Sequence, residues 1–171
     1  MAQARRHMAA QPPTDKGERR SMAQTLRRIQ ALTPASAGMA AATRAETTAS
    51  TVACSAAAVG LAAIGLIHLL DAPGKYSEAP YMFWMYLALI AGCLPGAMLL
   101  LRAHARLGWV AAMVLSISPF IGYVLSRTTG LPGAMGDIGN WTEPLGLASL
   151  HVEACVFALG LYGLAWLQRT Q

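Results

Sequence analysis

Four long apolar stretches dominate the pattern of hydrophobic and polar positions after residue 50. They cover residues 51–70, 81–101, 107–126 and 145–167, and few polar residues interrupt them. An α-helix rises about 1.5 Å per residue, so about 20 apolar residues are long enough to cross a bilayer. The alternation typical of a strand is absent. The pattern therefore predicts an all-α integral membrane four-helix bundle, built from two helical hairpins, in residues 51–171.

Composition supports this interpretation and excludes several classes of protein. Of the 171 residues, 55% are hydrophobic and only 12% are charged. This balance is atypical of disordered proteins, coiled coils and small disulfide-framework proteins, and it leaves too few charges to cover a soluble domain. Basic residues outnumber acidic ones by 13 to 8. Because the basic residues are distributed as in a membrane protein, the expected partner is a lipid bilayer and not nucleic acid.

The positions of Lys and Arg predict how the four helices are oriented. Eleven of the 13 basic residues lie before residue 51, between the second and third stretches, or at the C-terminus, whereas Lys75 and Arg127 belong to the other two loops. Cytoplasmic loops carry an excess of Lys and Arg. We therefore expect both termini in the cytoplasm and the loops 71–80 and 127–144 on the outer side.

Residues 1–50 form an arm that is rich in Ala, Arg, Ser, Thr and Gln. No apolar stretch follows its arginines closely, which argues against a normal secretory signal peptide. Met22, Leu26 and Ile29 recur near helical spacing between arginines, so residues 21–33 are a candidate short amphipathic helix on the inner leaflet. The alternatives are a disordered tail, an organellar transit peptide, or a true first residue at a later methionine.

The two predicted outer loops resemble each other, which indicates two hairpins of the same orientation. They share an N-cap residue type, a carboxylate and a proline: Ser77, Glu78 and Pro80 before the second stretch, and Thr142, Glu143 and Pro144 before the fourth. Proline suits the first helical turn, and a carboxylate favours the positive end of a helix. Convergent turn chemistry is the alternative to a true repeat.

Small residues recur every four positions in the two central stretches. The two sets are Ala88, Gly92 and Gly96 in the second stretch, and Gly108, Ala112 and Ser116 in the third. Such stripes let helices approach closely in a membrane. We expect them to pack helices within the bundle, with a dimer interface as the alternative.

Glu153 is the residue that most strongly suggests a polar site within the membrane. It lies about eight residues, or roughly 12 Å, into the fourth helix, where a lone carboxylate costs several kcal/mol. Arg127, His68 and His151 belong to the same outer half of the bilayer. The plainest interpretation is a buried polar clasp, in which Glu153 pairs with Arg127 or a histidine and fixes the helix register.

Three functional interpretations of these groups stay open. His68, Asp71, His151 and Glu153 are candidate ligands of copper or zinc, and His68 with His151 are candidate axial ligands of a haem b. In the third interpretation, Glu153 and a histidine pass protons or a cation. Positions 151 and 153 lie about 200° apart on a helix, which argues against a shared metal. We therefore expect no cofactor, with copper and haem b as alternatives.

No sequence motif of a soluble catalytic domain is present. The chain has no P-loop, no dinucleotide-binding glycine fingerprint, no HExxH and no Gly-x-Ser-x-Gly. Cys54, Cys93 and Cys155 show no CxxC spacing, and we interpret them as packing residues. An enzyme is not expected.

Two segments with distinctive motifs support a family resemblance. The first is Ile67–Pro73 with Glu78–Tyr81, and the second is Gly122–Gly133 with Trp141–Gly146 and Glu153. They resemble small four-helix membrane proteins of high-GC Gram-positive bacteria, a group that brings no established activity. The resemblance implies a bacterial cytoplasmic membrane and importance for the outer-side residues, His68, Glu78, Arg127, Glu143 and Glu153. It also implies that the similar proteins have an apolar residue at the position of His151.

The leading functional hypothesis from the sequence is non-catalytic. Small size, short loops, small-residue stripes and the lack of a catalytic motif favour an accessory or assembly subunit of a larger membrane complex, with other membrane subunits as partners. An oxidase or oxygenase is one example of such a complex. One alternative is a metal- or haem-binding redox protein that uses the outer polar group. Another is a small transporter that acts as an oligomer.

Overall fold

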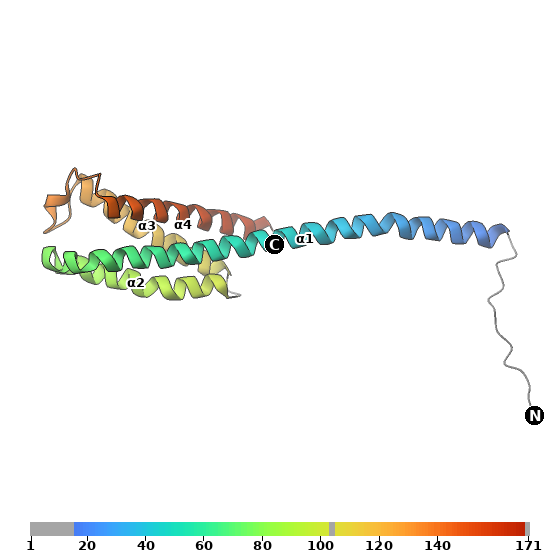
Figure 1. The fold of residues 1–171 in the computed structure, drawn as a ribbon, viewed down its shortest axis with the longest axis horizontal. Coiled ribbons are helices and arrows are strands. Elements are labelled where there is room, and N and C mark those ends of the chain that lie inside the picture. Colours follow the sequence, from blue (N-terminus) through green and yellow to red (C-terminus); the bar gives the residue numbers. More distant parts are fainter. Residues whose placement is uncertain (1–15, 103–104, 170–171) are drawn as a thin grey trace, which may run out of the picture. The chain divides into compact units, whose positions relative to one another are not determined.

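The computed structural model describes residues 16–102 and 105–169, and this part of the chain is helical without a strand. Its α-helices are α1 (Lys16–Glu78), α2 (Pro80–Leu101), α3 (Ala105–Thr128) and α4 (Pro144–Arg169) (Figure 1). A short 3-10 helix, η1 (Met135–Asp137), lies between α3 and α4. All four α-helices are long and apolar enough to cross a membrane. The predicted all-α class is confirmed.

The chain divides into two compact units, residues 1–47 and 48–171. In the first unit, the described residues from Lys16 onward are helical. The short helix expected at 21–33 is therefore part of a longer helix. Residues 1–15 lie outside the described part of the chain.

The second unit is a bundle made by the later half of α1 together with α2, α3 and α4 (Figure 1). Its apolar core draws on all four helices: Ala57, Leu61 and Ile64 from α1, Cys93 and Leu100 from α2, Trp109 and Ala112 from α3, and Val156 from α4. Small residues bring the helices close together. A Cβ added at Gly108 would lie 2.8 Å from the backbone nitrogen of Leu100, so α2 and α3 touch there backbone to backbone.

The predicted small-residue stripes pack inside the bundle, with one exception. Gly92 and Gly96 of α2 face Leu115 of α3, and Ala112 and Ser116 are fully buried. Ala88 is exposed, so the stripe on α2 is shorter than predicted. The expectation of close packing within the bundle is confirmed for the other positions.

The connection between α1 and α2 corrects the expected loop at 71–80. Helix α1 continues to Glu78 and α2 begins at Pro80, so only Ala79 is non-helical. The residue before a proline is biased toward extended backbone, and Ala79 adopts it, with φ −150° and ψ 99°. Pro80 therefore breaks the helix, whereas the Pro73–Gly74 pair does not. Ser77 is not an N-cap, because it lies inside α1, where its hydroxyl donates to the Gly74 carbonyl.

The connection between α3 and α4 is much longer and covers residues 129–143. Positive φ angles at Gly130, Gly133 and Gly139 allow its turns. Glu143 caps α4, because its Oε2 accepts the backbone N–H of Gly146 at 3.1 Å. The prediction that Thr142 fills this role is wrong. The two connections are alike only in that Pro80 and Pro144 each begin a helix, as expected.

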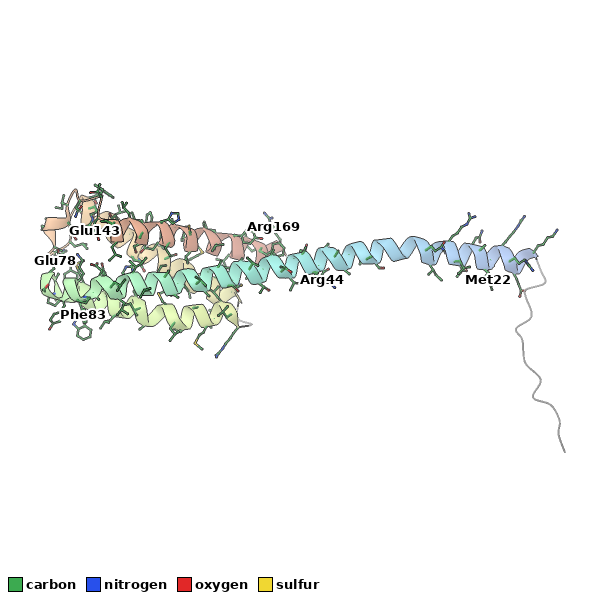
Figure 2. All side chains as sticks on the ribbon, in the orientation of Figure 1. Met22, Arg44, Glu78, Phe83, Glu143 and Arg169 are labelled. Carbon is green, nitrogen blue, oxygen red and sulfur yellow. The ribbon has the colours of Figure 1, made fainter. Side chains whose placement is uncertain are left out.

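Both connections lie at the same end of the bundle, which we call the hairpin end and define by Ala79 and residues 129–143. Figure 2 shows Glu78 and Glu143 at this end and Arg169 at the opposite end of the second unit. The polar residues singled out in the sequence lie near the hairpin end.

Candidate functional site

A cavity of about 370 Å³ lies at the hairpin end of the bundle. Its lining combines charged and polar side chains from all four helices and the α3–α4 connection: Asp71, Asp137, Glu143, Glu153, Lys75, Arg127, His68, Tyr86, Tyr123, Ser118, Ser126 and Ser149. Cavities that hold small molecules in proteins have volumes of about 300–1,000 Å³. We call this space the hairpin-end cavity.

Glu153 is the most deeply buried charged residue of the cavity, with 1% of its surface exposed. The Ser149 hydroxyl, one turn earlier in α4, donates to its Oε1 at 2.5 Å. His68 Nε2 of α1 lies 3.9 Å from the same oxygen. No described residue donates a hydrogen bond to the other oxygen, Oε2. One half of this carboxylate thus lies buried without a donor, although buried polar atoms are usually hydrogen-bonded.

His68 lies between Glu153 and a second polar pair. Its Nδ1 is 2.9 Å from the carbonyl oxygen of Ile64, and because a carbonyl only accepts, Nδ1 carries the proton. Nε2, which faces Glu153, is then an acceptor whenever the ring is neutral. The ring also packs edge-on against Tyr86, with centroids 4.7 Å apart.

Tyr86 extends this arrangement to a second carboxylate. Its hydroxyl donates to Asp71 Oδ2 at 3.0 Å. Asp71, Tyr86, His68 and Glu153 therefore follow one another along the cavity wall. In the described part of the chain, no basic side chain lies within ion-pair distance of Asp71. Among the same residues, His68 is the only basic side chain within ion-pair distance of Glu153.

An ionic cluster lies beside these groups, and we define it as Lys75, Glu78, Arg127, Asp137 and Glu143. All of its members except Glu78 line the cavity. Arg127 Nη1 lies 2.7 Å from Asp137 Oδ1, and its Nη2 donates to Glu143 Oε2 at 3.3 Å. Lys75 Nζ contacts Glu78 at 2.7 Å and Asp137 at 3.3 Å. The cluster thus ties the end of α1 to η1 and to the ends of α3 and α4.

Arg127 is held tightly within this cluster. Only 5% of its surface is exposed, and its guanidinium lies 4.7 Å from the centre of the Tyr123 ring, a cation–π distance. Its carbonyl accepts the N–H of Gly139. The sequence suggested Arg127 as a partner of Glu153, but the structure pairs it with Asp137 and Glu143.

His151 lies apart from the other predicted site residues. It is exposed, and its Nε2 lies 3.8 Å from Cys155 Sγ. His68 is buried and faces the cavity, so the structure does not bring together the two histidines that the haem interpretation requires. Among the described residues, no group of three His, Cys, Asp or Glu side chains is arranged to hold a metal ion. The predicted copper or zinc set, with Asp71, is therefore not assembled.

Sequence reasoning missed several residues of the cavity. Ser149 precedes Glu153 by four residues, a spacing that brings helical side chains together and could have identified it. Nothing in the sequence distinguishes Tyr86 from other aromatic residues of the apolar stretches, and the pattern indicates Lys75 only as a charge in a predicted loop. Asp137 lies in a connection without periodicity, and no local signal links it to Arg127.

A scan against protein-family models and searches of curated proteins and of solved structures find no match to this chain. A fold by itself does not determine a function. The function has to be inferred from the cavity and its side chains.

Proposed function

We propose that this chain is a multi-pass membrane protein that binds a small molecule in the hairpin-end cavity. The observation that carries the proposal is a cavity of about 370 Å³ beside the buried, half-partnered carboxylate of Glu153. Ionisable groups inside a membrane bundle are costly and usually mark a functional site. A volume of this size, lined by a few converging polar groups and by apolar side chains, is typical of ligand sites.

The proposal includes a location and an orientation. The excess of Lys and Arg at the termini and in the α2–α3 connection supports termini on the cytoplasmic side. The resemblance to membrane proteins of high-GC Gram-positive bacteria supports the bacterial cytoplasmic membrane. The hairpin-end cavity then opens toward the outer side, and its ligand arrives from there.

A purely structural clasp explains the cavity less well. A polar group retained only to fix helix register is expected to be fully hydrogen-bonded and closely packed. His68 does lie near Glu153, at 3.9 Å, but Glu153 Oε2 receives no hydrogen bond from the described residues, and Glu153 is one of the residues that line the cavity. These features favour a site that a ligand completes.

The packing of the core favours binding over transport. Leu61, Ile64 and Val156, which lie farther from the hairpin end than the cavity, are almost completely buried. Together with Trp109, they fill the bundle toward its opposite end. A pathway through one copy of the chain would have to displace this core.

A cavity-filling variant tests the proposal. Gly122 lines the cavity, and a Cβ added there would meet nothing within 4 Å. We expect Gly122→Leu to fill the space without disturbing the fold. Gly74→Leu is the matched control, because its added Cβ also meets nothing within 4 Å but Gly74 does not line the cavity.

The measurement is ligand-observed NMR with a panel of charged and neutral fragments and the full chain in lipid nanodiscs. We expect at least one chemical class of fragment to bind to the unchanged protein and to Gly74→Leu, and to lose binding in Gly122→Leu. If no fragment distinguishes Gly122→Leu from the other two proteins, the cavity is not a ligand site.

One observation favours the accessory-subunit role as a second candidate. Met22, Leu26 and Ile29 recur at helical spacing in the first unit and are 56%, 55% and 55% exposed. An apolar stripe flanked by arginines is suited to another membrane subunit or to the lipid surface. We expect site-specific photocrosslinking from position 26 to give one defined protein adduct in intact cells, and adducts with lipid alone would reject this role.

A further inference from the structure

We infer that the ligand of the hairpin-end cavity is a small organic amine in its protonated form, which donates a hydrogen bond to Glu153 Oε2. This inference rests on the proposed function, because it names the class of ligand for the same cavity.

The lining carries an excess of negative charge. Four carboxylates, those of Asp71, Asp137, Glu143 and Glu153, face two permanently basic side chains, those of Lys75 and Arg127. Charge of one sign inside a low-dielectric space attracts a ligand of the opposite sign. The formal balance therefore favours a cation.

Both basic side chains already have carboxylate partners. Arg127 contacts Asp137 and Glu143, and Lys75 contacts Asp137 and Glu78. Glu143 also caps helix α4 through the N–H of Gly146. Lys75 and Arg127 are thus both held by the three carboxylates of the ionic cluster, and neither is paired with Glu153 or Asp71. Among the described residues, the one basic side chain within ion-pair distance of Glu153 is His68.

The two remaining carboxylates receive hydrogen bonds only from neutral hydroxyl groups. Tyr86 donates to Asp71, and Ser149 donates to Glu153 Oε1. Glu153 is 99% buried, and its Oε2 has no donor among the described residues. A charge-assisted hydrogen bond from an ammonium group supplies both the missing donor and the missing positive charge.

The surroundings favour an organic cation over a bare metal ion. Ca²⁺ or Mg²⁺ needs six or more oxygen ligands within about 2.6 Å, and the described residues assemble no such group. Apolar side chains complete the lining, namely Ile67, Met82, Met85, Leu89, Pro119, Leu131 and Leu145. An apolar body with an ammonium group matches this combination. Because Oε2 needs an N–H donor, a protonated amine fits better than a quaternary ammonium.

Arg127 does not point to an anionic ligand. Its Nε lacks a hydrogen-bond partner among the described residues, which at first suggests a carboxylate or phosphate. Two carboxylates already contact this guanidinium, however, and they would repel a further anion. The Nε–H is suited to donate a hydrogen bond to a neutral oxygen of a ligand.

A series of four related aromatic probes tests the inference with the full chain in nanodiscs of phosphatidylcholine. The probes are 2-phenylethylamine, the neutral 2-phenylethanol, the anionic phenylacetate, and trimethyl(2-phenylethyl)ammonium. We expect the primary amine to bind at least about tenfold more tightly than the other three in calorimetric titrations, because only it donates a charge-assisted hydrogen bond. This comparison requires no variant.

Two substitutions then locate the bound amine. Glu153→Gln removes the negative charge from the cavity, and we expect it to weaken amine binding about tenfold or more. Glu46→Gln makes the same chemical change at an exposed position in the first unit and is expected to leave binding unchanged. Gly122→Leu is expected to abolish binding.

The outcomes separate the inference from the proposed function. If phenylethanol or phenylacetate binds as tightly as the amine, and Gly122→Leu abolishes that binding, the cavity is a ligand site but the amine inference is overturned. Amine binding that is equally strong in Glu153→Gln overturns the inference as well. If none of the probes binds and the fragment panel gives no cavity-dependent signal, both the inference and the proposed function are overturned.

Discussion

At the residue scale, the central feature of the molecule is a buried carboxylate with too few hydrogen-bond donors around it. Glu153 has one hydroxyl donor on one oxygen and none from the described residues on the other. Proteins retain such groups where function needs them and lose some stability in exchange. The sequence identified Glu153 and His68, because charged groups stand out in apolar helices, but it could not identify Tyr86, an ordinary aromatic residue.

Glu153→Gln therefore distinguishes a ligand site from a clasp. An amide in place of the buried carboxylate still accepts from Ser149 and has a lower desolvation cost, so we expect the free energy of unfolding to rise by about 1 kcal/mol. The measurement is SDS-induced unfolding of the unliganded protein in mixed micelles. A clasp predicts the opposite sign, and a loss of about 1 kcal/mol or more would favour it.

Arg127 is predicted to be the most sensitive residue of the ionic cluster. Arg127→Met removes two ion pairs and leaves Asp137 and Glu143 without their guanidinium, so we expect a loss of about 2–3 kcal/mol in the free energy of unfolding. Arg102→Met, at an exposed position, is the control and is expected to change it by less than about 0.5 kcal/mol. Equal effects of the two substitutions would show that the cluster contributes little.

At the element scale, the sequence predicted helices better than it predicted the connections. The four apolar stretches predicted the helices well, because stretches of about 20 apolar residues occur mainly in membrane-spanning helices. The α1–α2 connection was mispredicted, because Pro73–Gly74 suggested a loop whereas Pro80 sets the break through Ala79. The course of residues 129–143 depends on contacts such as Arg127 with Asp137, which join positions that no local pattern relates.

Close helix contacts give a prediction at this scale. Gly108→Ala places a Cβ within 2.9 Å of the backbone of Leu100, and backbone atoms cannot move aside as a flexible side chain can. We expect a loss of about 1–3 kcal/mol in the free energy of unfolding. The control, Gly74→Ala, meets nothing within 4 Å and should gain about 0.5–1 kcal/mol from helix propensity. Equal values for the two variants, measured by SDS unfolding, would contradict the α2–α3 contact.

At the scale of the whole molecule, the chain consists of an arm unit and a bundle unit, residues 1–47 and 48–171. The residues that line the cavity all belong to the second unit. We expect a chain that lacks residues 1–47 to keep its affinity for 2-phenylethylamine within about twofold of that of the full chain. Loss of binding in the folded, truncated protein would show that the arm takes part in the site.

The orientation of the bundle determines from which side a ligand reaches the cavity. The balance of Lys and Arg in the sequence predicts that the hairpin end faces outward. Two positions report on the two ends of the bundle. Gly136 lies in the α3–α4 connection, where an added Cβ meets nothing within 4 Å, and Gln168 is exposed near the end of α4.

The most direct test of the account is cysteine labelling in intact bacterial cells with a membrane-impermeant maleimide. Single cysteines, Gly136→Cys or Gln168→Cys, are introduced after the three native cysteines have been replaced by alanine. We predict that position 136 reacts in intact cells and that position 168 reacts only after the membrane is permeabilised. Labelling of position 168 in intact cells, or of both positions only after permeabilisation, would contradict the membrane-spanning bundle with an outward-facing cavity.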